Sequence, residues 1–250
     1  MALVPVVTFG LVIGSFLNVV IARVPERRSL WMPGSTCPGC GNAIAWHDNI
    51  PLVSFLVLQG RCRACAAPIP WRYPLVEATT AALFVAAWLV FGGDLRQFVM
   101  AVVFLAMLVA ITVIDLRHQI IPDVITLPGI GVGLVASVAA DRVSWLQSVV
   151  GILVGGGLFV LVIVLSRGGM GGGDLKLGAM LGAFLGWKAL LVGLFVAVML
   201  GGLSAVALLA SRRLARKDAI PFGPFLALGG AVALFWGDAI LAWYLGGFER

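Results

Sequence analysis

The chain has 250 residues, of which 61% are hydrophobic and 11% are charged, and its formal net charge is +6. A soluble domain carries about a quarter charged residues, so this composition excludes a soluble globular protein and indicates a membrane protein. The hydrophobic runs are continuous rather than alternating, which favours a helical bundle over a β-barrel. In such a protein the positive charge reports orientation in the membrane, and we expect no nucleic-acid partner.

Eight hydrophobic segments follow one another along the chain, several of them near the roughly 20 residues with which a helix spans a bilayer. A polar stretch separates the first two and contains all four cysteines, whereas only Gly186, Trp187 and Lys188 separate the sixth from the seventh. We therefore predict an all-α membrane bundle of about eight transmembrane helices, divided into a first helix (1–22), a loop domain (23–74) and the remaining bundle (75–250). The segments are 3–22, 75–92, 97–115, 124–140, 145–166, 175–186, 188–210 and 221–245.

The positions of the basic residues predict the orientation of these segments. If the N-terminus lies outside, 13 of the 17 Lys and Arg residues fall on the cytoplasmic side, as the positive-inside rule requires. The four on the outer side are then Arg96, Arg142, Lys188 and Arg250. This orientation places the cysteine loop in the cytoplasm. It also places Asp115, which ends the third segment, and Asp174, which begins the sixth, at the cytoplasmic membrane boundary.

The polar loop contains two C-x-x-C pairs, separated by 21 residues. This separation is slightly longer than the roughly 15 to 20 residues usual for zinc sites of this type. Four thiolates nevertheless complete a tetrahedral structural zinc site, and a reducing cytoplasm disfavours disulfides. Zinc would supply folding energy to a loop with little core, while free thiols or a redox pair are the alternative. The candidate ligands are Cys37, Cys40, Cys62 and Cys65.

Glu77 lies near the start of the second segment. A carboxylate in a membrane segment is costly and needs either a function or a partner. Arg72, close by in the sequence, is the candidate for an interfacial ion pair.

A glycine-rich stretch precedes Asp174, with five glycines among residues 168–173. We expect a tight loop with few side chains, which lets another backbone approach closely. Because Asp115 and Asp174 share the same predicted depth, packing of the bundle can bring them together. Two carboxylates in a poorly solvated site cannot both ionise freely, so one keeps its proton. Such a pair is suited to peptide hydrolysis, because the anion activates a water while the acid polarises the scissile carbonyl.

Structural roles are the alternative for these aspartates. Asp174 would then cap the sixth helix, and Asp115 would pair with Arg117 or His118. Asp123 follows a proline and precedes a hydrophobic segment. We expect it to be the N-cap of the fourth helix rather than a catalytic residue.

Two motifs around the aspartates resemble a known family. Residues 115–123 read DLRHQIIPD and are followed by Thr-Leu-Pro at 126–128, which resembles the first aspartate motif of the type IV prepilin peptidases. Residues 169–177 read GMGGGDLKL and resemble their second, glycine-x-glycine-aspartate motif. The paired motifs are specific, and further matches extend the resemblance over nearly the whole chain. These matches are at 14–19, 23–25, 73–77 and 220–224.

The resemblance implies an aspartic endopeptidase of the bacterial inner membrane, with Asp115 and Asp174 as its catalytic pair. Such enzymes remove the short basic leader of prepilins and pseudopilins at the cytoplasmic face, so the implied partners are these substrates and the lipid bilayer. Members with a four-cysteine loop commonly also N-methylate the new N-terminus with S-adenosylmethionine. S-adenosylmethionine is therefore an implied cofactor beside the zinc ion, and Glu77 is a candidate for its site.

Two other functions remain open at this point. The first is a peptidase without methyltransferase activity. The second is a non-enzymatic assembly or transport component, in which the zinc loop docks a partner and the aspartates bind protons or cations.

Overall fold

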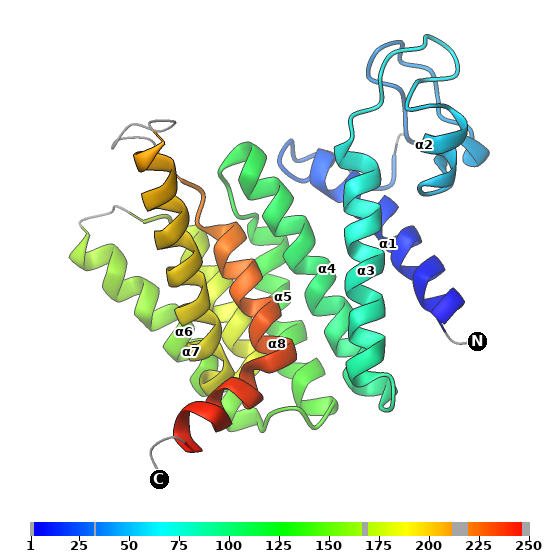
Figure 1. Ribbon diagram of the computed structural model, residues 1–250. Helices are drawn as coiled ribbons and strands as arrows, with labels where there is room; N and C mark the ends of the chain where they lie inside the picture. Colours follow the sequence, from blue (N-terminus) through cyan, green and yellow to red (C-terminus); the bar gives the residue numbers. More distant parts are fainter. Residues whose placement is uncertain (1–2, 33, 167–169, 212–219, 247–250) are drawn as a thin grey trace. The chain divides into compact units, whose positions relative to one another are not determined.

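The computed structural model describes residues 3–32, 34–166, 170–211 and 220–246. Within these ranges it contains eight α-helices, α1 to α8, and one short 3-10 helix, η1, and the β-pairing consists of two isolated bridges (Figure 1). The predicted all-α class is therefore confirmed. Among the described helices, six are long and apolar enough to cross a membrane: α1, α3, α4, α6, α7 and α8. The chain divides into two compact units, Met1–Gly93 and Asp94–Arg250. The predicted division at 22/23 and 74/75 stays a prediction.

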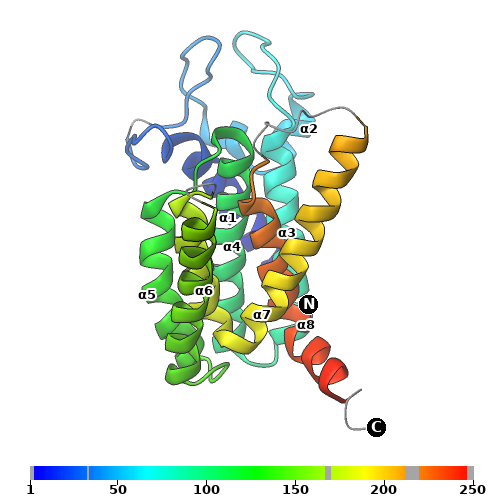
Figure 2. The ribbon, with the colours of Figure 1, turned by 90° about the vertical axis from the view of Figure 1, so that its left-hand side faces the viewer.

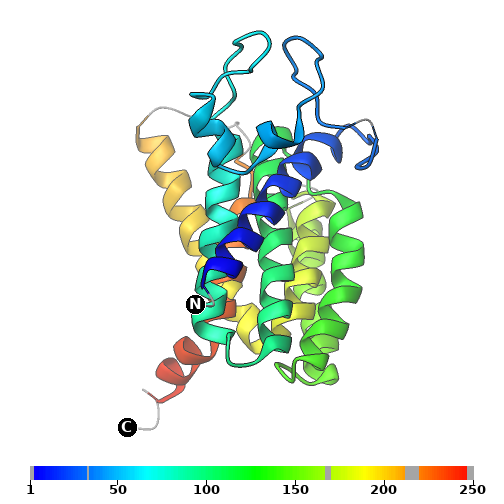
Figure 3. The same cartoon turned by 90° about the vertical axis from the view of Figure 1, so that its right-hand side faces the viewer.

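The first unit is built on two antiparallel helices, α1 (Leu3–Arg23) and α3 (Arg72–Phe91) (Figure 3). Two glycines one helical turn apart allow their close approach. A Cβ atom at Gly10 would lie 2.6 Å from the Cα of Ala81, and one at Gly14 would lie 2.6 Å from the Cα of Glu77. Small residues spaced by four are a common means of close packing between membrane helices.

The insert between α1 and α3 holds η1 (Trp46–Asn49) and α2 (Val53–Val57). Its two cysteine turns have the same local structure. In each turn the first cysteine accepts a hydrogen bond at its carbonyl from the amide four residues later, from Gly41 in one turn and Ala66 in the other. Both of these residues have positive φ, 74° for Gly41 and 57° for Ala66. The insert thus contains a small structural repeat.

The second unit is a bundle of antiparallel helices (Figure 2). Asp94 caps the helix Leu95–His118 by accepting a hydrogen bond from the Arg96 amide, and a capping box of Ser144 and Gln147 begins the helix Trp145–Leu165. Pro128 lies inside α5. The helices are α4 (Leu95–His118), α5 (Asp123–Ala139), α6 (Trp145–Leu165), α7 (Gly172–Ala210) and α8 (Gly223–Gly246).

Helix α7 is broken at Gly186, whose φ of 69° and ψ of 167° are not helical. Leu181 and Gly193 lie on opposite sides of this break, yet both contact neighbouring glycines of α8, Gly230 and Gly229. The second arm therefore runs back beside the first, so the predicted break between the sixth and seventh segments is confirmed. With α7 counted as two arms, the described residues contain eight hydrophobic helical segments. Two of them, α5 with 17 residues and the first arm of α7 (172–185), are shorter than the candidate spans.

Two buried serines support this break. The carbonyl of Ala183 accepts hydrogen bonds from the Ser137 hydroxyl at 2.9 Å and from the Ser148 hydroxyl at 2.7 Å. These hydroxyls come from α5 and α6 and supply hydrogen bonds where the regular helical pattern of α7 ends. Glycines of α6 and the first arm of α7 pack backbone to backbone beside them, Gly151 against Gly182 and Gly155 against Gly178.

Candidate active site and candidate metal centre

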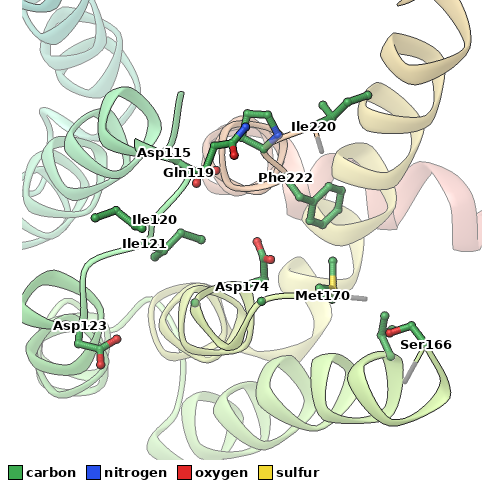
Figure 4. Close-up of a pocket in the computed structure, with 14 residues that line it drawn as sticks. Asp115, Gln119, Ile120, Ile121, Asp123, Ser166, Met170, Asp174, Ile220 and Phe222 are labelled. Carbon is green, nitrogen blue, oxygen red and sulfur yellow. The ribbon is translucent and has the colours of Figure 1, made fainter. Parts of the chain in front are cut away.

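A cavity of about 650 Å³ opens at one end of the second unit. Side chains from four separate parts of the chain line it: the end of α4 with residues 119–123, the end of α6, the start of α7, and residues 220–222 before α8 (Figure 4). Both Asp115 and Asp174 are among them. The walls of the cavity are largely apolar and are formed by side chains such as Ile121 and Phe222.

Asp115 is held rigidly at the edge of this cavity. It lies in the last turn of α4 and is 5% exposed, and the preceding residues Ile111 and Ile114 are fully buried. Its Oδ2 atom accepts a hydrogen bond of 3.0 Å from the backbone amide of Gly223, at the start of α8. Asp115 is thus hydrogen-bonded to α8, whereas the expected partners were Arg117 and His118.

Asp174 is the third residue of α7, and its half-buried side chain points into the same cavity (Figure 4). Gly171 occupies the N-cap position, and its backbone amide interacts with the Asp174 carboxylate. Asp115 and Asp174 are close enough to repel one another electrostatically. The structure therefore brings together the two aspartates that the sequence motifs singled out.

The glycine-rich stretch differs in part from the expected loop. Gly172 and Gly173 already belong to the first turn of α7, while Gly168 and Gly169 lie outside the described residues. Position 173 requires glycine for a steric reason, because a Cβ atom there would lie 2.9 Å from the Cβ of Ile121. Its missing side chain lets the start of α7 pack against the segment that follows Asp115.

The expected N-cap role of Asp123 is wrong. Pro122 occupies the N-cap position of α5, and Asp123 is the first helical residue, without a side-chain cap. Both carboxylate oxygens of Asp123 instead accept hydrogen bonds from Lys176 Nζ, at 2.7 and 2.6 Å. This ion pair joins α5 to α7 beside the cavity. Sequence reasoning missed the pair, although Lys176 stands only two residues after Asp174. It also missed the contact of Gly223, which lies in a Pro-Phe-Gly-Pro turn.

Glu77 lies in the first unit and has a backbone partner there. It is 8% exposed, and its Oε2 atom accepts a hydrogen bond of 2.9 Å from the amide of Leu52, at the start of α2. The suggested partner Arg72 instead contacts the Tyr73 hydroxyl and ring. Glu77 therefore fastens the insert to α3.

The four cysteines of the insert form one cluster. Their Sγ atoms all lie within 4.8 Å of one another, and those of Cys37 and Cys65 are 3.8 Å apart. A tetrahedral zinc ion with Zn–S bonds of about 2.3 Å needs sulfurs about 3.8 Å apart, so the cluster fits this metal. The backbone amides of Gly39 and Cys40 lower the pKa of the Cys37 thiol to about 6. The pKa of the Cys65 thiol is raised to about 11, because hydrogen bonds with the other thiols and burial outweigh the lowering by the Ala67 amide.

An ion pair links the second cysteine turn to η1. The Arg63 guanidinium donates to both oxygens of Asp48, with distances of 2.6 Å from Nη2 to Oδ1 and 2.8 Å from Nε to Oδ2. Hydrogen bonding to Arg63 holds the pKa of Asp48 below its ordinary value. The pair therefore favours the folded insert at neutral pH.

These features define a class of protein: a polytopic helical membrane protein with paired aspartates at one end of a bundle and a four-thiol cluster in a loop. Two family models match the chain, the Bacterial Peptidase A24 N-terminal domain over residues 8–91 and the Type IV leader peptidase family over residues 102–206. The chain belongs to the type IV leader peptidase family.

Curated relatives match over nearly the whole chain. A protein from Aeromonas hydrophila is 40% identical, with 96% of this chain and 92% of the relative covered. One from Pseudomonas aeruginosa is 38% identical, with 96% and 92% covered, and one from Bacillus subtilis is 35% identical, with 95% of each covered. All three are named prepilin leader peptidase/N-methyltransferase. No solved structure matches the chain significantly.

Proposed function

We propose that this membrane enzyme cleaves the leader from type IV prepilins and pseudopilins, with Asp115 and Asp174 as its catalytic residues. The family and the names of its relatives support the activity. The observation that carries the assignment of residues is the shared cavity, because two aspartates 59 positions apart in the sequence face one space at the end of the bundle. The third carboxylate of this cavity, Asp123, is instead paired with Lys176.

The reaction proposed is direct hydrolysis by water. One carboxylate takes a proton from a water molecule, whose oxygen attacks the scissile carbonyl carbon, while the other carboxyl group gives its proton to the carbonyl oxygen. The tetrahedral intermediate then collapses, the peptide C–N bond breaks, and the leaving nitrogen receives a proton. Much of the cavity wall is apolar, and the bare backbone at Gly171 leaves room for an extended peptide.

Replacing either aspartate with asparagine tests this assignment. Asp115→Asn and Asp174→Asn keep the size of each side chain but remove its acid–base function, so full-length prepilin should accumulate unprocessed. Asp123→Asn is the matched control, because it changes a third carboxylate of the same cavity and should leave cleavage largely intact. Normal processing by both catalytic variants would favour the non-enzymatic assembly or transport component instead.

We also propose the bacterial inner membrane as the location, with the N-terminus outside and the catalytic cavity at the cytoplasmic face. In the second unit, Arg117 and Lys176 lie near the cavity, in the last turn of α4 and the start of α7. Arg96 lies at the other end of α4, and Arg142 lies in the loop between the end of α5 and α6. This distribution agrees with the positive-inside rule. Protease digestion of an N-terminal epitope tag in spheroplasts tests it, since the tag should be cleaved without membrane disruption. A protected tag would reverse the orientation.

The proposed metal is one structural Zn²⁺ held by Cys37, Cys40, Cys62 and Cys65. The compact arrangement of the four sulfurs supports this proposal. Bound zinc would stabilise the insert, which has few buried apolar side chains of its own. Elemental analysis of the purified protein should find one zinc per chain, and Cys40→Ser should lose it. A zinc-free protein with a reversible dithiol would support the redox alternative.

The second activity proposed is methyl transfer from S-adenosylmethionine to the new N-terminus, with Glu77 as a candidate residue of the donor site. The names of the relatives and the buried position of Glu77 support it. Because Glu77 also accepts a hydrogen bond from the Leu52 amide, Glu77→Gln could act through the insert instead of the donor site. The variant is therefore tested both for methylation of the product and for cleavage and zinc content. Loss of the added methyl mass with normal cleavage and zinc content fits a donor-site role. Loss of zinc as well would indicate a structural role alone, and a wild-type product without the methyl group would indicate a peptidase only.

A further inference from the structure

We propose that Gly223, the first residue of α8, is a positioning residue for Asp115. The proposal rests on the proposed catalytic role of Asp115. Gly223 contributes in two ways: its backbone amide orients the carboxylate, and its missing side chain leaves the space that the carboxylate occupies. The turn Pro221–Pro224 is thus a third segment of the site, beside the two aspartate motifs.

The first observation is the hydrogen bond. The Gly223 amide donates to Oδ2 of Asp115 at 3.0 Å, and the bond is buried. It fixes which oxygen faces α8 and which faces the cavity. A carboxylate also gains from lying at the N-terminus of a helix, where backbone amides are free, and Gly223 is the first residue of α8.

The second observation is steric. A Cβ atom at Gly223 would lie 2.6 Å from Oδ2 and 3.1 Å from Cγ of Asp115, and 3.2 Å from Cδ1 of Ile121. The Asp115 side chain must therefore move if any other residue stands at position 223. Ile121 closes one direction of escape, so the carboxylate would be displaced within the cavity.

The backbone conformation of Gly223 does not itself require glycine, because its φ is not in the left-handed region. Alanine is a better helix former than glycine, so secondary structure alone would favour Gly223→Ala. The positioning role and the local structure therefore predict opposite effects of the same substitution. This opposition makes the proposal testable.

The test compares Gly223→Ala with Gly202→Ala in the full-length protein, purified in detergent, with a full-length type IV prepilin as substrate. Gly202 also lies in a helix of the second unit, but a Cβ atom there would have no atom within 4 Å. We expect kcat of Gly223→Ala to fall by about 100-fold, as for a catalytic group moved by about 1 Å, with KM and the melting temperature little changed. The pH profile of kcat should also shift, whereas Gly202→Ala should match the wild type.

Several outcomes decide the matter. A kcat for Gly223→Ala within threefold of Gly202→Ala would overturn the proposal, as would a rise in KM alone. If Gly223→Ala does not accumulate, Pro224→Ala decides, because it loosens the turn without adding a side-chain atom. A several-fold lower kcat at unchanged KM then supports positioning, and an unchanged kcat overturns it. Asp115→Asn is measured in parallel. Full activity of that variant would refute the catalytic role of Asp115, whatever Gly223→Ala does.

Discussion

The break in α7 provides a quantitative test of the fold, because one carbonyl there accepts hydrogen bonds from two side chains. Ser148 donates its single hydroxyl proton to the carbonyl of Ala183, whereas Ser137 also lies against the carbonyl of Gly133 and can donate to only one of them at a time. Removing Ser148 should therefore cost more than removing Ser137. In both single variants the remaining hydroxyl still satisfies Ala183.

The expected magnitudes follow from this sharing. A hydrogen bond between membrane helices contributes about 0.6 kcal/mol on average, so Ser137→Ala should cost about 0.5 kcal/mol and Ser148→Ala about 1 kcal/mol. The double variant leaves a buried carbonyl without a side-chain donor, which costs about 1–3 kcal/mol. We therefore expect it to lose about 2.5–4.5 kcal/mol, more than the sum of the two single changes.

The assay is equilibrium unfolding of the purified protein in mixed micelles with increasing denaturing detergent. Ser204→Ala, in the second arm of α7, is the matched control, because no hydrogen bond of its side chain is part of this arrangement, and it should change the free energy of unfolding little. A double variant whose loss equals the sum of the singles would refute the reasoning, since Ala183 would then be satisfied by another donor.

Two further predictions concern the insert. Gly41→Ala should destabilise the zinc-bound protein by about 1 kcal/mol, because alanine is disfavoured at positive φ. Ala66→Gly, at the matching position of the other cysteine turn, should be neutral or stabilising. The temperature at which zinc is released measures both effects, and equal effects of the two substitutions would contradict the structural repeat. Asp48→Asn should destabilise the insert at pH 7. Because the folded-state pKa of Asp48 is lowered, the ion pair with Arg63 stabilises above the ordinary Asp pKa of about 4, and this stabilisation disappears as the pH falls through the lowered value. The difference from the wild type should therefore shrink in acid, and a difference independent of pH would exclude the pair as its cause.

Much of the fold was predictable because each membrane helix can be recognised from its own stretch of sequence. Long hydrophobic runs ended by charges or glycines gave the predicted segments, and even the short Gly186-Trp187-Lys188 boundary coincides with a real break. What the sequence could not indicate is how that break is stabilised. Ser137 and Ser148 look like ordinary polar residues in apolar segments, and their shared acceptor appears only when three helices are packed.

The candidate site shows the same division between local and long-range information. The two motifs singled out Asp115 and Asp174, but the expectation for Asp123 failed because capping rules consider only neighbours in the sequence. Its actual partner, Lys176, is 53 residues away. Likewise, Arg72 was the nearby candidate for Glu77, and the observed partner is a backbone amide of the insert. A charged side chain near a membrane takes the donor that packing provides, and sequence proximity is a poor guide to that donor.

Both aspartates of the cavity interact with the backbone amide of a glycine, Asp115 with Gly223 and Asp174 with Gly171. A side-chain donor such as lysine would bring a full charge, which would bind each carboxylate strongly and compete with water and substrate. A backbone amide orients a carboxylate without adding that charge, but it must approach closely, and only glycine leaves the space at position 223. Gly223 therefore contributes more than loop flexibility. Its lack of a side chain allows a backbone amide to hold the Asp115 carboxylate at the edge of the cavity.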